Sequence, residues 1–75
     1  METFRIDSLD AWGYEILIDG KTYIHQEFIP ALEGKRTFQT RGDALKVGKY
    51  VLKKISKRQS PALSAEEVRK ILTTN

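Results

Sequence analysis

The stretch that most constrains the fold runs over residues 12–26 and reads WGYEILIDGKTYIHQ. Aromatic and aliphatic residues recur at every second position over 12–18, which is the period of a strand with one buried face. Asp19-Gly20 follows, and this dipeptide readily adopts the positive φ angles of a tight hairpin turn. The next six residues are again rich in β-branched and aromatic side chains. The stretch therefore predicts a β-hairpin.

The register of this hairpin decides which side chains share a face. With a two-residue loop at 19–20, Ile16 faces Tyr23 and Tyr14 faces His25, and directly opposed residues share a face. That face would carry Trp12, Tyr14, Ile16, Ile18, Tyr23 and His25. The other face would carry Leu17, Thr22 and Ile24. A three-residue loop with a bulge would instead move His25 to the second face, so both registers remain open.

Further elements are predicted on both sides of the hairpin. The alternating segment before it predicts a first strand in which Phe4 and Ile6 face inward. Thr40 is a favourable N-cap for a long helix whose apolar residues recur at helical spacing. Ser64 and Glu67 form a capping box at the start of a second, shorter helix.

Together these elements predict an α+β fold: a three-stranded antiparallel β-meander covered by one long helix, plus a short C-terminal helix. A chain of 75 residues suits one small domain. Gly48 lies on the apolar face of the long helix, which predicts a close approach of this helix to the sheet. The predicted boundaries are residues 3–27 for the sheet, 28–39 for a loop, 40–57 for the long helix, 58–63 for a connector and 64–73 for the second helix.

Composition excludes several kinds of site. The chain has no cysteine, so a disulfide and a thiolate metal site are excluded. A histidine-based metal site needs more ligands than the single His25, and we expect no metal and no cofactor. No stretch is long and apolar enough to span a membrane. Residues 1–10 have no charged segment followed by an apolar run, so we expect no signal peptide within the sequence.

His25 is the only residue that suggests general acid–base chemistry. Asp7, Glu15 and Glu27 are candidate orienting partners, but no spacing in the sequence brings them to the histidine. The alternative is a structural residue that packs on Tyr14 and bonds backbone groups of the following loop. We predict this structural role, in which His25 tethers the loop after the hairpin, and we expect that the protein is not an enzyme.

A basic stripe runs along the predicted long helix, roughly opposite its apolar face at ~100° per residue. Its members are Lys46, Lys49, Lys53 and Lys57. Such a face is either ordinary solvated surface or a binding face for nucleic acid or an anionic surface. The net charge of +3 is mild, so it permits an acidic partner without requiring one.

The segment after the hairpin brings four apolar residues close together. They are Phe28, Ile29, Pro30 and Leu32. These side chains either complete the core, as so small a domain requires, or form an exposed apolar patch for a protein or peptide partner.

The runs GYEILIDGKTYIHQ, IPALEG, DALKVGKYVLKKI and SPALSAEEV resemble a bacterial family of small domains of unknown function, found mainly in Bacteroidetes. The resemblance extends from Gly13 to about Val68, and its most specific parts are residues 23–26 and 29–31. It implies a domain of the cell envelope, because members often carry a secretory or lipoprotein leader. It implies no activity.

These observations lead to two main hypotheses about function. The first is a non-enzymatic module that binds a protein or peptide partner, in the cell envelope or periplasm if a leader has been removed, or otherwise in the cytoplasm. The second is a binder of nucleic acid or of an anionic surface through the basic stripe. A small hydrolase that uses His25 is a third class with the least support.

Overall fold

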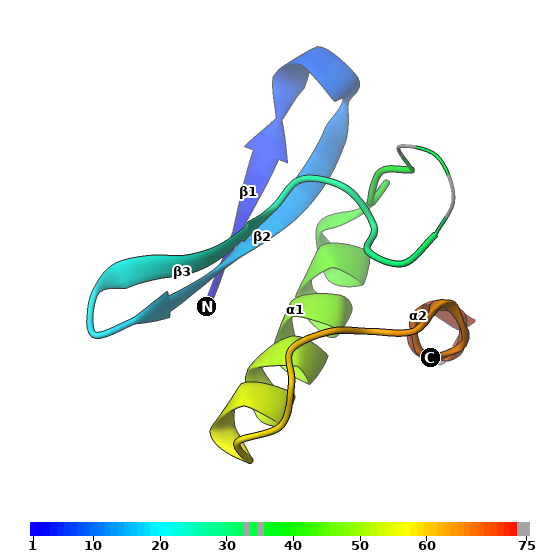
Figure 1. Cartoon of the computed structure of the whole chain (residues 1–75). Helices are drawn as coiled ribbons and strands as arrows, with labels where there is room; N and C mark the ends of the chain where they lie inside the picture. Colours follow the sequence, from blue (N-terminus) through cyan, green and yellow to red (C-terminus); the bar gives the residue numbers. More distant parts are fainter. Residues whose placement is uncertain (33, 35, 74–75) are drawn as a thin grey trace.

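A computed structural model describes residues 1–32, 34 and 36–73. In chain order it contains β1 (Glu2–Ile6), a 3-10 turn (Asp7–Leu9), β2 (Ala11–Ile18), β3 (Lys21–Gln26), α1 (Arg41–Ser56) and α2 (Ala65–Thr73). The strands form an antiparallel sheet in the order β1-β2-β3. Helix α1 packs on one face of this sheet and α2 packs against α1 (Figure 1). The predicted α+β fold is confirmed.

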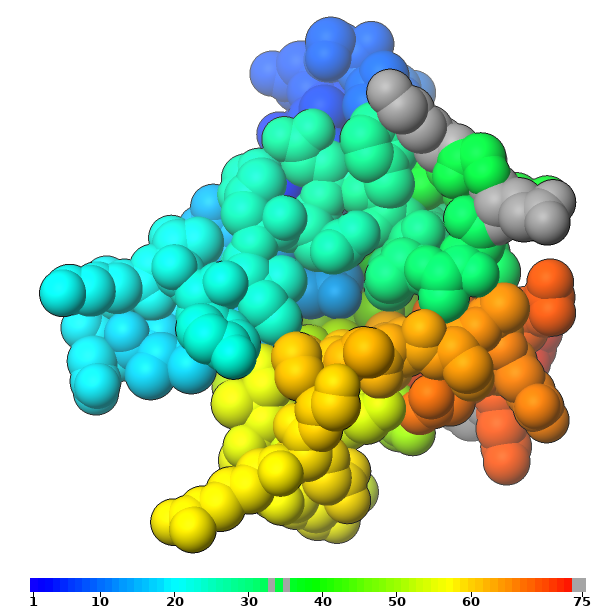
Figure 2. Space-filling view, viewed as in Figure 1, coloured from blue at the N-terminus to red at the C-terminus, as the bar shows by residue number. Residues whose placement is uncertain are grey.

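The β2–β3 connection is the two-residue turn that the sequence predicts. Asp19 and Gly20 have φ angles of 52° and 77°, and Ile18 pairs with Lys21 directly beside them. Positive φ at both central residues gives a turn whose twist matches that of the flanking strands. The turn projects from the body of the molecule (Figure 2).

Beyond this first pair, the register differs from the predicted one. Leu17 pairs with Thr22 and Ile16 pairs with Ile24, which leaves Tyr23 as an extra residue in a β-bulge. Of the two registers left open by the sequence, the one that pairs Ile16 with Tyr23 is therefore wrong. Because side chains alternate between faces, the extra residue reverses the faces of all later residues in β3.

The bulge decides which of the two faces left open by the sequence His25 occupies, and it also sets the face of Ile24. His25 pairs with Glu15 rather than with Tyr14, so it lies on the sheet face turned away from α1. Ile24, predicted on that outer face, instead packs against the core. A bulge leaves no mark in the alternation of a six-residue strand, so the sequence pattern alone did not reveal it.

Phe4 and Ile6 also lie on the outer face, which contradicts the predicted inward orientation. Phe4 pairs with Gly13 and Ile6 pairs with Ala11, one position out of phase with the buried Tyr14. Alternation in a five-residue strand fits either face equally well, because it does not say which face a helix will cover.

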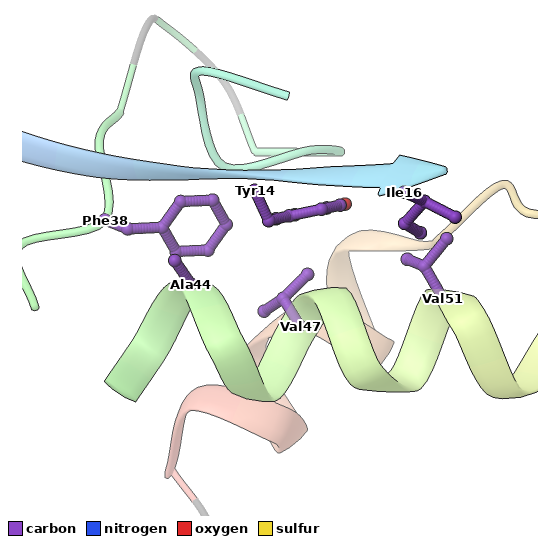
Figure 3. Close-up of a cluster of buried hydrophobic side chains, with 6 residues drawn as sticks. All are labelled: Tyr14, Ile16, Phe38, Ala44, Val47 and Val51. Atoms are coloured by element: carbon purple, nitrogen blue, oxygen red, sulfur yellow. The ribbon is translucent and has the colours of Figure 1, made fainter. Parts of the chain in front are cut away.

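The core lies between β2 and α1, where side chains of β2 point down onto the helix (Figure 3). Its buried members are Tyr14, Ile16, Phe38, Ala44, Val47 and Val51. Burial raises the pKa of Tyr14 to about 12. A Cβ on Gly48 would lie 3.1 Å from the Tyr14 side chain. The close approach of α1 to the sheet, predicted from Gly48, is therefore confirmed.

Phe38 joins the core because the chain returns to β2 at this point. Its carbonyl accepts a hydrogen bond of 2.9 Å from the Trp12 N–H, in an isolated antiparallel bridge. Two residues later, the Thr40 hydroxyl accepts from the Asp43 N–H at 3.1 Å and caps α1 as predicted. The return of the chain to β2 at Phe38 thus positions the start of α1 next to the sheet. No helix within the described part of the chain is long and apolar enough to cross a membrane.

Candidate functional site

His25 is held between two carboxylates on the outer face of the sheet. Its Nδ1 lies 2.7 Å from Glu15 Oε1, and its Nε2 lies 3.1 Å from Glu27 Oε2. Its ring stacks on Phe4 with centroids 4.7 Å apart and an interplanar angle of 8°. Gly13 makes this stack possible, because a Cβ there would lie 2.5 Å from the Phe4 ring.

These contacts favour the charged imidazolium, in which both ring nitrogens donate. The hydrogen bonds to Glu15 and then Glu27 raise the pKa of His25 above its usual 6.5. Because each nitrogen already bonds a carboxylate, neither is positioned to take a substrate proton or to bind a metal ion. Within the described residues, no group of three or more His, Cys, Asp or Glu side chains is arranged to hold a metal.

Two of the three candidate partners, Glu15 and Glu27, therefore lie at His25. The predicted packing on Tyr14 is wrong, because the ring stacks on Phe4. The loop is tethered by the next residue instead: the Gln26 side-chain amide donates to the Phe28 carbonyl at 2.6 Å. The Ile29 N–H donates to the Arg36 carbonyl at 2.7 Å further along the loop. Backbone groups that leave the β-ladder are satisfied in this way without the histidine.

The four apolar residues of this loop do not gather into one exposed patch. Phe28, Ile29, Pro30 and Leu32 are all half-buried, and Ile29 packs against the core. Two of them line a second hollow of about 480 Å³. That hollow is lined by Ile29, Leu32, Arg36, Thr37, Gln39, Asp43 and Leu72. Ile29 therefore contributes to the core, and a role of the segment in binding a partner stays a prediction.

The predicted basic stripe is present on α1. Lys46, Lys49, Lys53 and Lys57 are all exposed, at helical positions that place them opposite the buried face. The structure separates them into two pairs, however. Lys46 and Lys49 line a groove between the two helices, whereas Lys53 and Lys57 do not line it.

This α1–α2 groove has a volume of about 640 Å³ and is larger than the hollow beside Ile29 and Leu32. Its lining is mainly apolar and comes from α1, from α2 and from the residue before α2. The lining residues are Lys46, Lys49, Tyr50, Ser64, Glu66, Glu67, Lys70 and Ile71. Tyr50 is 37 % exposed, and Ile71 is half-buried and packs on the core.

Glu67 holds the groove together. Its Oε1 accepts the Ser64 backbone N–H at 3.0 Å, which completes the predicted capping box with the 3.1 Å bond from the Glu67 N–H to the Ser64 hydroxyl. Its Oε2 accepts the Tyr50 hydroxyl at 2.9 Å and the Lys54 ammonium at 3.3 Å. These partners, the Ser64 N–H first, lower the pKa of the Glu67 carboxyl to about 2.

The bonds from Glu67 to α1 were not predicted, and neither was the groove. The capping box revealed the helix start but not what else its carboxylate would bind, because the crossing of two helices depends on tertiary packing. Only the fold shows that Tyr50 of α1 and Ile71 of α2 line one groove.

The comparisons with known proteins identify a family but no activity. A family model described as a domain of unknown function (DUF4907) matches residues 2–70. No curated protein and no solved structure matches the chain.

Proposed function

The chain belongs to the DUF4907 family of domains of unknown function, and we propose that it is a non-enzymatic protein-interaction module. A short peptide segment of the partner protein binds in the α1–α2 groove. The observation that carries the proposal is the groove itself, which combines a mainly apolar lining with polar groups from two helices. Its volume of about 640 Å³ falls within the roughly 300–1,000 Å³ typical of ligand sites.

The arrangement of polar groups supports a binding role over a catalytic one. His25 has both ring nitrogens bonded to carboxylates, and Glu67 has both oxygens bonded to donors. Groups held in this way orient side chains, whereas a general base needs a nitrogen or oxygen directed at substrate. Tyr50 and Ile71 supply apolar contacts from opposite walls of the groove.

The test is a selection of ligands from a random peptide display library on the purified domain. Selected peptides are then titrated into ¹⁵N-labelled protein. The expected result is that amide shifts change on α1 and α2, with the largest changes around Tyr50 and Ile71. Selection of no peptide, or of peptides whose shift changes fall on the sheet alone, would reject the proposal.

A pair of tyrosine variants provides a matched control. Tyr50→Ser removes an aromatic ring from the groove, and Tyr23→Ser removes one that is 57 % exposed on β3. We expect Tyr50→Ser to weaken peptide binding and Tyr23→Ser to leave it unchanged. An equal effect of both variants would show that binding is a general response to lost aromatic surface.

The second candidate function is binding of nucleic acid or an anionic surface through the basic stripe. The exposure of Lys46, Lys49, Lys53 and Lys57 along one side of α1 favours it. Titration against a labelled oligonucleotide at two salt concentrations tests it, because phosphate contacts weaken steeply as salt rises. Absence of binding at low salt rejects this function.

We further propose a location in the cell envelope, with the cytoplasm as the alternative. The support is the sequence resemblance, whose members often carry a secretory or lipoprotein leader. Fractionation of cells that express the full-length gene with a C-terminal tag distinguishes the two locations. Recovery of the tagged protein only in the soluble cytoplasmic fraction would contradict the envelope assignment.

A further inference from the structure

We infer that the protein binds anionic lipid bilayers through the tip of the β2–β3 hairpin and the C-terminal end of α1. This tip surface lies outside the α1–α2 groove, so the inference goes beyond the proposed function and does not depend on it. Three features carry the inference: the two segments lie at one end of the molecule, their exposed apolar side chains lie outside the core, and their charge is mainly positive. The residues of the tip surface are Ile18, Lys21, Tyr23, Lys53, Lys57 and Arg58.

The hairpin turn and the end of α1 lie at the same end of the molecule, because β2 and α1 run side by side in the same direction. Tyr14 and Ile16 follow one another along α1, and Ile16 lies beside Val51 (Figure 3). The residues after Ile16 and after Val51 therefore continue towards the same end. Figure 2 shows the hairpin turn (cyan) and the end of α1 (yellow) as two projections, whereas the β1–β2 turn (blue) lies at the far end.

Two large apolar side chains are exposed on the hairpin. Ile18 is 40 % exposed and Tyr23 is 57 % exposed, and neither belongs to the core cluster. The bulge leaves Tyr23 without a partner in the ladder, and bulges commonly redirect a side chain in this way. Tyrosine rings favour the interface of a bilayer, where the ring is in apolar surroundings and the hydroxyl stays hydrated. The tip of the hairpin thus offers apolar side chains to the interfacial layer of a bilayer.

The charge of the tip surface is mainly positive. Asp19 is the acidic residue of the hairpin turn, and the acidic residue of α1 is Asp43, in its first turn and away from this end. The cations are Lys21, Lys53, Lys57 and Arg58, and all four side chains are exposed. Within the described part of the chain, none of these four forms a salt bridge or a side-chain hydrogen bond, unlike the neighbouring Lys54, which is paired with Glu67. Their charge therefore remains available to an anionic partner.

This combination fits a bilayer better than a nucleic acid. A bilayer accepts apolar side chains beneath the level at which its phosphates meet lysine and arginine. A nucleic acid would contact the cations but would leave the aliphatic Ile18 in water, because bases stack on aromatic rings. A bilayer is also flat over the distance that separates the two projections, so the hairpin tip and the end of α1 reach it together.

The experiment measures sedimentation of the purified protein with lipid vesicles. Vesicles of phosphatidylcholine alone are compared with vesicles that also contain phosphatidylglycerol, at low and at physiological salt. We expect binding to the anionic vesicles that weakens as salt rises, and little binding to the neutral ones. Absence of binding to anionic vesicles at low salt, or equal binding to both kinds of vesicle, would overturn the inference.

Two aliphatic variants test whether the hairpin tip enters the bilayer. Ile18→Ser should weaken binding to anionic vesicles about threefold or more, because it removes apolar surface that the bilayer would cover. Leu9→Ser is the matched control, since Leu9 is 45 % exposed in the 3-10 turn at the far end of the sheet, and it should leave binding unchanged. An equal loss in the two variants would mean that the hairpin tip is not the part that enters the bilayer.

Two charge reversals on α1 test the second projection. At physiological salt, Lys57→Glu should weaken vesicle binding about tenfold or more, whereas Lys49→Glu, which lines the groove, should have a much smaller effect. Equal effects would show that the whole basic stripe meets the partner, which contradicts the assignment to this end. Binding of an oligonucleotide that is tighter than vesicle binding, and unaffected by Ile18→Ser, would overturn the inference in favour of nucleic acid.

Discussion

Two side chains, His25 and Glu67, each join segments that are distant from one another, but they do so with opposite chemistry. His25 is a donor at the centre of its contacts: it bonds Glu15 of β2 and Glu27 beyond β3, and it stacks on Phe4 of β1. Glu67 is an acceptor at the centre of its contacts. It receives bonds from Tyr50 and Lys54 of α1 and from the Ser64 N–H before α2.

The two centres also differ in what surrounds them. His25 lies on the outer face of the sheet, with 45 % of its side chain exposed, whereas Glu67 lies at the contact of two helices and lines the groove. Glu2 pairs directly with Glu15 across β1 and β2, and like charges opposite each other are destabilising. The positive His25 offsets that repulsion. His25 thus balances the charge of nearby carboxylates on the sheet surface, whereas Glu67 fixes the position of α2 on α1.

The largest loss of stability is expected from substitution of Gly13, because the stack of Phe4 on His25 needs a residue without a side chain at this position. Gly13→Val would place a Cβ 2.5 Å from both the Phe4 ring and the Gln26 carbonyl oxygen, and the backbone oxygen cannot move aside easily. We expect a loss of about 2–3 kcal/mol in the free energy of unfolding, measured in urea. Gly42→Ala is the control, since its Cβ would approach no atom closer than 3.8 Å. Equal stability of the two variants would show that the Phe4–His25 stack is not tightly packed.

The next largest effect is expected from the cap of α2. Ser64→Ala removes the hydroxyl that accepts from the Glu67 N–H at 3.1 Å, and loss of such a cap costs about 1 kcal/mol. Hydrogen exchange should accelerate in α2 more than in the sheet. Ser8→Ala, at an exposed position of the 3-10 turn, is the control. A uniform acceleration over the whole chain would mean that α2 does not open as a separate unit.

A smaller effect is expected on the pH dependence of stability, which should differ between His25 and Glu67. The pKa of His25 is raised above 6.5, so its contribution is complete below that pH and is lost as the pH rises through the higher folded value. The pKa of Glu67 is lowered from 4.5 to about 2, so its contribution is complete above pH 4.5 and is lost as the pH falls towards 2. The two contributions are therefore complete together between pH 4.5 and 6.5.

The measurement is Tm against pH for the parent, His25→Gln and Glu67→Gln. His25→Gln should have a Tm about 2–4 °C below that of the parent near pH 5. The difference should disappear as the pH rises through the raised pKa of His25. Glu67→Gln should lose its difference from the parent at the acid end instead. Parallel curves for all three proteins would mean that neither the charge of His25 nor the charge of Glu67 changes the Tm with pH.

The smallest effect is expected from the tyrosine hydroxyl of the groove. Tyr50→Phe keeps the ring and removes the 2.9 Å bond to Glu67. Because both groups are reached by solvent, we expect Tm to fall by only about 1–2 °C. The change should disappear in a Glu67→Gln background if the bond to the carboxylate is its cause. If Tyr50→Phe lowers the Tm even more in the Glu67→Gln background, the hydroxyl makes a stabilising contact with a group other than the carboxylate.

Much of the fold was predictable from local sequence, because its turns and caps have local causes. Asp19-Gly20 fits its turn through backbone preference, and Thr40 and Ser64 mark helix starts through side chains that reach only three residues. The Tyr23 bulge was not predictable in this way. One extra residue changes the partners of a whole strand without changing its composition.

The candidate site was less predictable, because it is formed by the crossing of two helices. The basic stripe of α1 was visible in the sequence, but the division between Lys49 in the groove and Lys53 outside it depends on where α2 packs. Glu15 and Glu27 were among the candidate partners of His25, but its predicted packing on Tyr14 was wrong because the bulge moves it to the other face. Helical periodicity locates a face, and only tertiary packing decides what that face meets.

The bridge between Trp12 and Phe38 has a consequence for how this chain can vary in length. Gln26 pairs with Tyr14 and Phe38 bridges to Trp12, so the chain leaves and rejoins β2 only two positions apart. The intervening segment is thus closed at its base, and lengthening a closed loop costs little entropy, about 0.6 kcal/mol for each doubling. The loop is therefore a natural place for insertion of a tag or a foreign epitope, because the strand and helix on either side are positioned by β2 and not by the loop's length.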